Sequence, residues 1–179
     1  MNKVENKMSE QEHKDIFEHW LQQHQALLFK VVRAYAVQKA DQDDLFQEVC
    51  LQVWRSVPRF KGASAVTTWL YRIALHTAIT WKKKVRRREE QNILYVRETP
   101  QHEIPPQKNA QLEWLFSEIT RLDKIDRSIA LLLLDGFSYK EMAEILGISE
   151  SNVGVKIHRI KQRLTKRAAE NQKNHTYGL

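Results

Sequence analysis

Basic and polar side chains recur on one face of a predicted helix near the end of the chain, from Ser149 to about Arg167. Positive charge binds nucleic-acid phosphates, and amide and guanidinium groups can hydrogen-bond to base edges in the major groove. Residues 151–169 contain no acidic residue, whereas an ordinary solvated helix face usually mixes both signs. The side chains on this face are those of Asn152, Lys156, Arg159, Lys161, Arg163, Lys166 and Arg167. A basic surface helix without a ligand is the alternative interpretation.

The residues before this helix have the chemistry of a helix-turn-helix, in which two helices meet at a sharp angle. Ala143 supplies the small residue at the contact, Gly147 suits a turn with positive φ, and Ile148 follows as a buried residue. Ser149 is a good N-cap, and the N–H groups after it are free to meet a phosphate. The inward stripe recurs at steps of four, three and four: Val153, Ile157, Ile160 and Leu164. The sequence therefore predicts a DNA-binding helix-turn-helix over 137–164.

A second stretch, residues 61–88, combines positive charge with aromatic side chains and contains no acidic residue. Opening duplex DNA requires charge to hold the backbone and aromatic surface on which an unpaired base can stack. Trp69 and Tyr71 supply aromatic rings, although Trp69 also lies on the apolar stripe, so core packing and strand contact both remain open for it. Ile73 and Trp81 are expected in the core. The basic residues are Lys61, Arg72, Lys82, Lys83, Lys84, Arg86, Arg87 and Arg88.

A third group of side chains is acidic and lies in DQDDLFQEV, residues 41–49. Carboxylates are favoured at the positive end of a helix dipole, so a solvated helix start is the simplest interpretation of the residues alone. A metal or catalytic carboxylate cluster is a weaker alternative, because no histidine follows at ligand spacing and no glycine bends a loop as calcium sites require. The acidic residues are Asp41, Asp43, Asp44 and Glu48.

Composition places these stretches in an all-helical protein. The 179 residues include only five glycines and four prolines, and apolar residues recur at helical spacing throughout. The net charge of +7 suits a polyanionic partner, although many basic proteins have none. Cys50 is the only cysteine, so neither an intramolecular disulfide nor a zinc site of several cysteines can form, and we expect it to be a small core hydrophobe. No stretch approaches the roughly 20 apolar residues of a membrane span, which predicts a soluble cytoplasmic protein.

The pattern of helices and prolines predicts two domains. A capping box of Ser9 and Glu12 begins the first helix, Asp41 to Asp44 open the second, which Pro58 ends, and the third begins at about Thr67. Residues 89–108 hold three of the four prolines and form a predicted flexible linker, which could extend to about 60–70 Å. Four further helices are predicted within 112–122, 125–134, 139–146 and 149–167. The predicted domains are therefore 10–88 and 109–170.

Three motifs together resemble the extracytoplasmic-function (ECF) group of sigma factors of bacterial RNA polymerase, in the sigma-70 family. They are DQDDLFQEVCLQVWRSVPRFKG (41–62), SAVTTWLYRIALHTAITWKKK (64–84) and SYKEMAEILGISESNVGVKIHRIKQRL (138–164). The resemblance implies an all-α protein with a region 2 helical bundle (10–88) and a region 4 helix-turn-helix (109–170). It implies a transcription initiation factor that is not itself an enzyme and needs no cofactor or metal. The implied partners are core RNA polymerase, through the β′ clamp coiled coil and the β subunit, promoter DNA, and an anti-sigma factor.

The resemblance also assigns residues to three surfaces. Matching positions for docking onto β′ are Asp44, Leu45, Gln47, Glu48, Leu51 and Trp54. Recognition and melting of the −10 element are implied for Lys61, Ser64, Trp69, Arg72, His76 and Lys83. Recognition of the −35 element is implied for Ser149, Asn152, Val155, Lys156, His158, Arg159 and Arg163.

The chain departs from the family pattern at several of these positions. His76 stands where the family often has asparagine, which changes the hydrogen bonds available to a −10 base. The recognition helix reads VGVKIHRI over 153–160, where the family commonly has VKSRLHRA. Gly154 thus removes a basic side chain and could let the backbone approach DNA, while Val155 offers a methyl surface suited to thymine. Asp123 replaces a usual proline and can cap the next helix equally well.

Two other functions compete with this interpretation. A stand-alone helix-turn-helix regulator would bind duplex DNA without polymerase, as a dimer, but it has no need of residues 41–84. A small helical enzyme would use the carboxylates of 41–48, but no phosphate loop, nucleophile context or metal-spaced histidine supports it.

Overall fold

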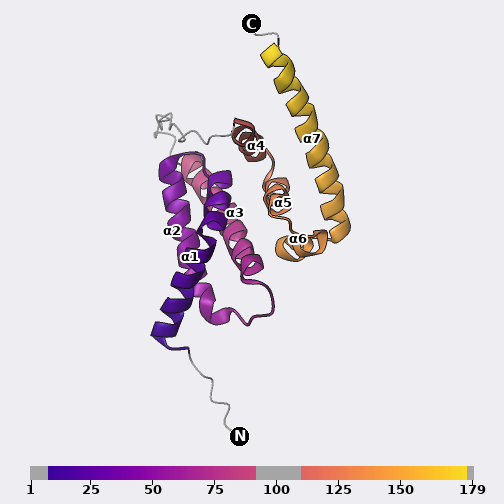
Figure 1. The fold of residues 1–179 in the computed structure, drawn as a ribbon. Coiled ribbons are helices and arrows are strands. Elements are labelled where there is room, and N and C mark those ends of the chain that lie inside the picture. The colour runs from indigo at the N-terminus through magenta and orange to yellow at the C-terminus, as the bar shows by residue number, and fades with distance from the viewer. Residues whose placement is uncertain (1–7, 92–109, 177–179) are drawn as a thin grey trace. The chain divides into compact units, whose positions relative to one another are not determined.

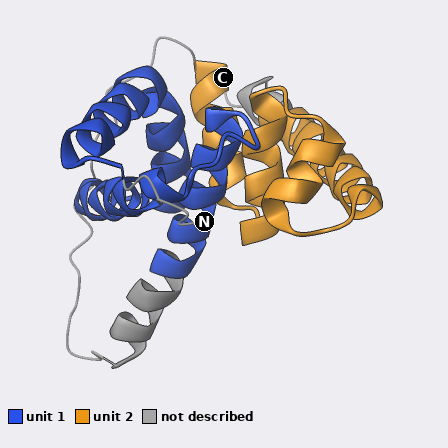
Figure 2. Ribbon diagram, turned by 90° about the horizontal axis from the view of Figure 1, so that it is seen from below, with its two compact units in different colours: residues 1–102 blue, residues 103–179 orange. Residues whose placement is uncertain are grey.

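The computed structural model describes residues 8–91 and 110–176, of which 82–91 and 172–176 are described by their backbone alone. Every regular element in the described ranges is helical, which confirms the predicted all-α class. The chain forms two compact units, residues 1–102 and 103–179 (Figures 1 and 2). The predicted linker falls outside the described residues over 92–108, whereas 89–91 continue a helix.

The first unit is a bundle of α1 (Glu10–Tyr35), α2 (Lys39–Ser56) and α3 (Val66–Gln91), with the short 3-10 turn η1 (Val57–Arg59) after α2 (Figure 1). Each of the three helices packs against the other two. Their apolar stripes meet in a core that excludes water, and this burial is the main stabilising term for such a bundle. The core includes Leu28, Val31, Leu45, Val49, Val53, Leu70, Tyr71, Ala74 and Leu75.

Local sequence signals set most of the helix ends in this unit. The predicted capping box is present, since the Ser9 hydroxyl accepts from the Glu12 amide and the Glu12 carboxylate accepts from the Ser9 amide. Pro58 lies in the first turn of η1, directly after α2 ends. The predicted start of α2 at Asp41 was wrong by two residues: the helix begins at Lys39, whose ammonium pairs with Asp43 one turn later.

The second unit contains α4 (Ala110–Thr120), α5 (Lys124–Leu134), α6 (Tyr139–Leu146) and α7 (Glu150–Thr176). Helices α5 and α6 both pack on α7. The core is formed by Ile119, Ile129, Leu131, Leu132, Met142, Val153, Ile157 and Ile160. Helix α7 runs nine residues past its predicted end at Arg167, because no residue in that range breaks a helix.

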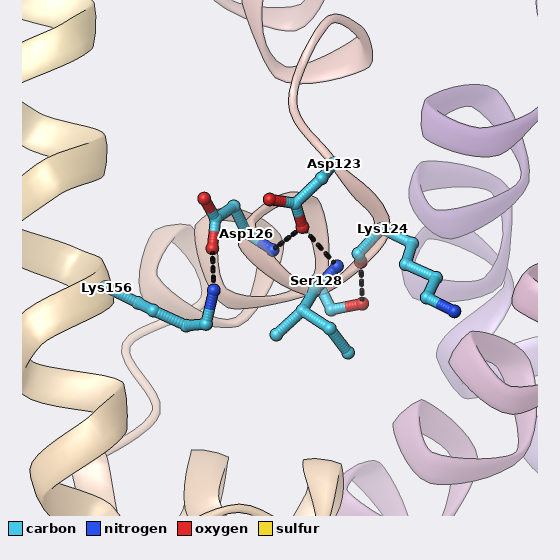
Figure 3. Close-up of polar contacts among 6 residues, drawn as sticks. Asp123, Lys124, Asp126, Ser128 and Lys156 are labelled. Carbon is cyan, nitrogen blue, oxygen red and sulfur yellow. Dashed lines mark hydrogen bonds and ion pairs between the residues drawn. The ribbon is translucent and has the colours of Figure 1, made fainter.

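The predicted caps of the second unit are confirmed. The Asp123 carboxylate accepts hydrogen bonds from the amides of Ile125 and Asp126, at 2.9 and 3.0 Å (Figure 3). A second capping box, which was not predicted from the sequence, is formed by Ser138 and Glu141 and begins α6.

Two glycines in the second unit should respond oppositely to substitution by alanine. Gly154 lies inside α7, where a Cβ would meet the Tyr139 ring at 3.6 Å, an ordinary contact distance. We expect Gly154→Ala to raise the free energy of unfolding by about 0.5–1 kcal/mol, because alanine favours the helix. Gly147 has φ +67, a conformation that alanine rarely adopts. Gly147→Ala should therefore lower the free energy of unfolding by about 1 kcal/mol or more. Urea denaturation followed by circular dichroism measures the unfolding free energy of each variant. A change in the same direction for both variants would contradict the backbone conformations assigned to the two glycines.

The Asp123 cap should make the second unit sensitive to acid. Burial alone would raise the pKa of Asp123, but the amides of Asp126 and Ile125 and the charge of Lys156 outweigh burial, so the pKa lies below its ordinary 3.8. A lowered folded pKa means that the ionised carboxylate stabilises the fold above about pH 4, and that this contribution is lost as the pH falls through the folded value.

Asp123→Asn keeps a capping oxygen but removes this titration. The difference in unfolding free energy between wild type and this variant should therefore be largest near pH 7 and shrink towards pH 3. Hydrogen exchange of α5, corrected for intrinsic rates, assigns the effect to this unit. A difference that does not change with pH would show that the charge of Asp123 contributes nothing.

Candidate nucleic-acid interface

The turn between α6 and α7 has the backbone conformation that the sequence predicts for a helix-turn-helix. Gly147 adopts the left-handed conformation, with φ 67 and ψ 36. The amides of Gly147 and Ile148 both donate to the carbonyl oxygen of Ala143, at 2.9 and 3.2 Å. The Ser149 hydroxyl accepts from the Asn152 amide at 3.2 Å, which confirms its capping role. Ile148, predicted to be buried, is only half-buried.

The burial of one stripe of α7 fixes which side chains face solvent. Val153, Ile157 and Ile160 are at most 2% exposed, and Leu164 is half-buried. Successive helical residues are turned by about 100°, so the opposite face carries positions one or two residues away from this stripe. Of the residues predicted to read the −35 element, the exposed ones are Ser149, Asn152, Val155, His158, Arg159 and Arg163.

Lys156 does not belong to this exposed face, contrary to the prediction. Its ammonium lies 2.6 Å from the Asp126 carboxylate of α5, and the two side chains are only 25% and 20% exposed (Figure 3). The ion pair joins α7 to α5 and is shielded from solvent more than a surface pair. The Lys156 ammonium therefore already has a carboxylate partner within the second unit.

Gly154 is also not open to a DNA backbone in the way the sequence suggested. The ring of Tyr139, the first residue of α6, lies against this part of α7. Tyr139 was not among the predicted site residues, although it is 42% exposed. Its position one residue after a helix cap gave no signal, because the sequence does not show which side of α7 it would meet.

The predicted −10 residues lie in the loop after η1 and on the exposed side of α3. Lys61 and Ser64 are exposed on either side of Gly62, which has φ 70. Arg72 and His76 are exposed one turn apart on α3. The side chain of Lys83 falls outside the described residues.

Trp69 is part of an aromatic cluster and also half-exposed. Its indole N–H donates to the Ser56 hydroxyl at 3.2 Å, and its ring lies 5.7 Å from that of Phe60. Phe60 in turn meets Trp20 edge-on at 5.1 Å. Packing and contact with a DNA strand are therefore compatible for Trp69. Tyr71, expected to offer aromatic surface, is fully buried in the core, so that expectation was wrong.

Not all of the α2 residues predicted for docking are exposed. Asp44, Gln47 and Leu51 are exposed, and Glu48 is half-buried, where its carboxylate accepts from the side-chain Nε2 of Gln52 at 2.8 Å. Leu45 is 0% exposed and belongs to the bundle core, so it cannot contact a partner on this surface.

The other apolar side chains on α2 also pack within the first unit. The Trp54 ring is stacked on that of His13 at 3.8 Å, and the His13 ring nitrogen is hydrogen-bonded to the Trp54 carbonyl at 2.8 Å. One face of Trp54 is thus covered by α1. Cys50, predicted to be a small core hydrophobe, is only half-buried, and this burial raises the pKa of its thiol.

Comparison with known proteins identifies both units. The family described as Sigma-70 region 2 matches residues 20–88, and the one described as Sigma-70 region 4 matches residues 112–164. RNA polymerase sigma factor YlaC of Bacillus subtilis is 32% identical over 69% of this chain and 75% of its own length. The ECF RNA polymerase sigma-E factor of Escherichia coli K12 is 30% identical over 70% of this chain and 73% of its own.

Solved structures share the fold at lower identity. The sigma factor RpoE of Bartonella quintana, solved with the anti-sigma factor NepR, is 20% identical, with a TM-score of 0.66 over 84% of this chain and 94% of that one. CnrH, solved with the cytosolic domain of CnrY, has a TM-score of 0.63 over 88% of this chain and 90% of its own chain. No described helix is both long and apolar enough to cross a bilayer. The matches to both sigma regions and to these relatives show that the chain belongs to the ECF sigma factors of the sigma-70 family.

Proposed function

We propose that this chain binds core RNA polymerase and directs it to promoters through three surfaces: α2 for docking, the η1–α3 region for the −10 element, and α7 for the −35 element. The observation that carries the proposal is the presence of both sigma regions in one chain, each with its predicted polar residues largely on exposed faces. The protein supplies binding and promoter melting, while the polymerase supplies catalysis in the cytoplasm.

The exposed part of α2 suits a basic helical partner such as the β′ clamp coiled coil. Asp44 and Gln47 lie one turn apart and offer acceptors, while Leu51, 40% exposed, adds apolar surface a turn further along. A polar rim around a small apolar contact is the usual composition of a specific interface. Asp44, Gln47, Glu48, Leu51 and the exposed part of Trp54 are therefore the proposed docking residues.

The η1–α3 region combines the charge and aromatic surface that melting requires. Lys61 and Arg72 can hold phosphates, Trp69 can stack on an unpaired base, and His76 can hydrogen-bond to one. Half-exposure of Trp69 fits this use, because the buried edge fixes the ring while the other part remains accessible. Ser64 and Lys83 complete the proposed −10 residues.

The exposed face of α7 offers both base-reading and phosphate-binding groups. Asn152 and Arg159 carry the amide and guanidinium groups that pair with adenine and guanine edges. Ser149, His158 and Arg163 flank them and suit phosphate contacts.

We further propose that the β subunit contacts the second unit and that an anti-sigma factor regulates the chain. The second proposal is supported by the relative RpoE, which was solved with an anti-sigma factor. A stand-alone regulator is the second candidate function, but the presence of region 2 does not favour it.

Asp44→Ala combined with Gln47→Ala should weaken binding to core polymerase by about tenfold or more. Both side chains are exposed, so the unfolding free energy should change by no more than about 0.5 kcal/mol. Fluorescence titration of labelled protein with core polymerase measures the affinity. Glu18→Ala, which removes an exposed carboxylate from α1, is the control and should leave affinity unchanged. Equal affinities for all three proteins would rule out docking through this face.

Arg159→Ala and Lys156→Ala should separate a reading residue from a positioning residue. Arg159→Ala should weaken −35-dependent promoter binding by about 1–3 kcal/mol without altering stability. Lys156→Ala should instead lower the unfolding free energy by about 1–2 kcal/mol, because it leaves the partly buried Asp126 carboxylate without the Lys156 ammonium.

Promoter binding by holoenzyme and urea denaturation, measured on both variants, provide the two readouts. A stability loss in Arg159→Ala, or none in Lys156→Ala, would reverse these assignments.

A further inference from the structure

Gly154 allows an aromatic ring from the preceding helix to lie against the recognition helix. A Cβ built at Gly154 would lie 3.6 and 3.8 Å from Cε2 and Cδ2 of Tyr139, so the ring already occupies the space next to this backbone. A methyl group would therefore fit there at an ordinary contact distance. Tyr139 nevertheless remains 42% exposed, so part of the ring faces solvent.

A second apolar side chain is exposed directly beside this position. Val155 follows Gly154 and is turned about 100° further round α7, away from the buried stripe, where it is 48% exposed. Val155 of α7 and the Tyr139 ring of α6, which lies against Gly154, are therefore two exposed apolar groups near the start of α7. The polar side chains of Asn152 and Arg159 lie on the same outward face.

The major groove offers one apolar group to such a surface. Of the four bases, only thymine carries a methyl group there, at C5, and side-chain methyls and aromatic rings contact it favourably. A lysine or arginine at position 154 would place a charge where Tyr139 lies. With glycine in place of the family's basic residue at position 154, the Tyr139 ring offers an apolar contact at this point of the interface.

We propose that Tyr139, seated on Gly154 beside Val155, contacts the C5 methyl of a thymine in the −35 element and is a specificity-determining residue, although it lies outside the recognition helix. This inference rests on the proposed function, because it requires α7 to enter the major groove at that element. It predicts a preference for thymine at one position that the polar residues of α7 do not specify.

Replacement of thymine by uracil in the DNA tests the proposal, because the two bases differ only in the C5 methyl. Each thymine on either strand of the −35 element is replaced in turn, and holoenzyme binding is measured on a promoter located by its transcription start. Removal of one buried methyl should weaken wild-type binding about three- to fivefold at one position. The other replacements should have little effect.

Variants assign this sensitivity to the ring. Tyr139→Ala and Gly154→Arg should reduce the penalty at that position below about twofold, whereas Tyr139→Phe, which keeps the ring and removes the hydroxyl, should retain it. Arg159→Ala is the matched control: it should weaken binding to both templates and leave their ratio unchanged. Urea denaturation checks that each variant is folded.

Three results would overturn the inference. They are the absence of any methyl-sensitive thymine, an unchanged penalty in Tyr139→Ala, and loss of the penalty in Tyr139→Phe, which would assign the effect to the hydroxyl group. These results differ from a failure of the proposed function itself. In that case holoenzyme would form no promoter-specific complex on any template, and the inference about Tyr139 would fail as well.

Discussion

The left-handed backbone of Gly147 is the constraint on which the second unit depends. This residue ends α6 and directs the chain so that α7 packs its Val153–Ile160 stripe into the core. The backbone amides of Gly147 and Ile148 both donate to the Ala143 carbonyl oxygen. The sharp turn therefore leaves these three backbone groups hydrogen-bonded. Because the stripe is buried on one side only, the angle of this turn decides which side chains α7 presents to solvent.

Neighbouring helices then refine the surface that the turn exposes. Asp126 of α5 binds Lys156 on one side of α7, and Tyr139 of α6 covers Gly154 on another. A basic side chain is thereby held against α5, and a partly exposed aromatic ring lies beside α7. The same principle operates on α2, where the bundle core takes Leu45 and α1 covers one face of Trp54. In both units, packing decides which of the predicted residues remain exposed.

The fold was largely predictable because its signals are local. Caps such as Ser9 and Asp123, the turn glycine and the helical spacing of apolar residues act within a few positions of the chain. The sites were less predictable because they depend on contacts between elements. Tyr71 and Trp69 are two residues apart in one aromatic motif, yet one is buried and the other half-exposed. The Lys156–Asp126 pair spans 30 residues, and no periodicity could indicate it.

In the proposed function, both units act together to place core RNA polymerase on a promoter. Run-off transcription with purified core polymerase on fragments of the source genome, with and without this protein, tests it most directly. We expect new discrete start sites that share sequences near −10 and −35 and that appear only with the protein. Tight binding of the protein alone to duplex DNA, with no association with core polymerase and no new transcripts, would contradict it and favour a stand-alone regulator.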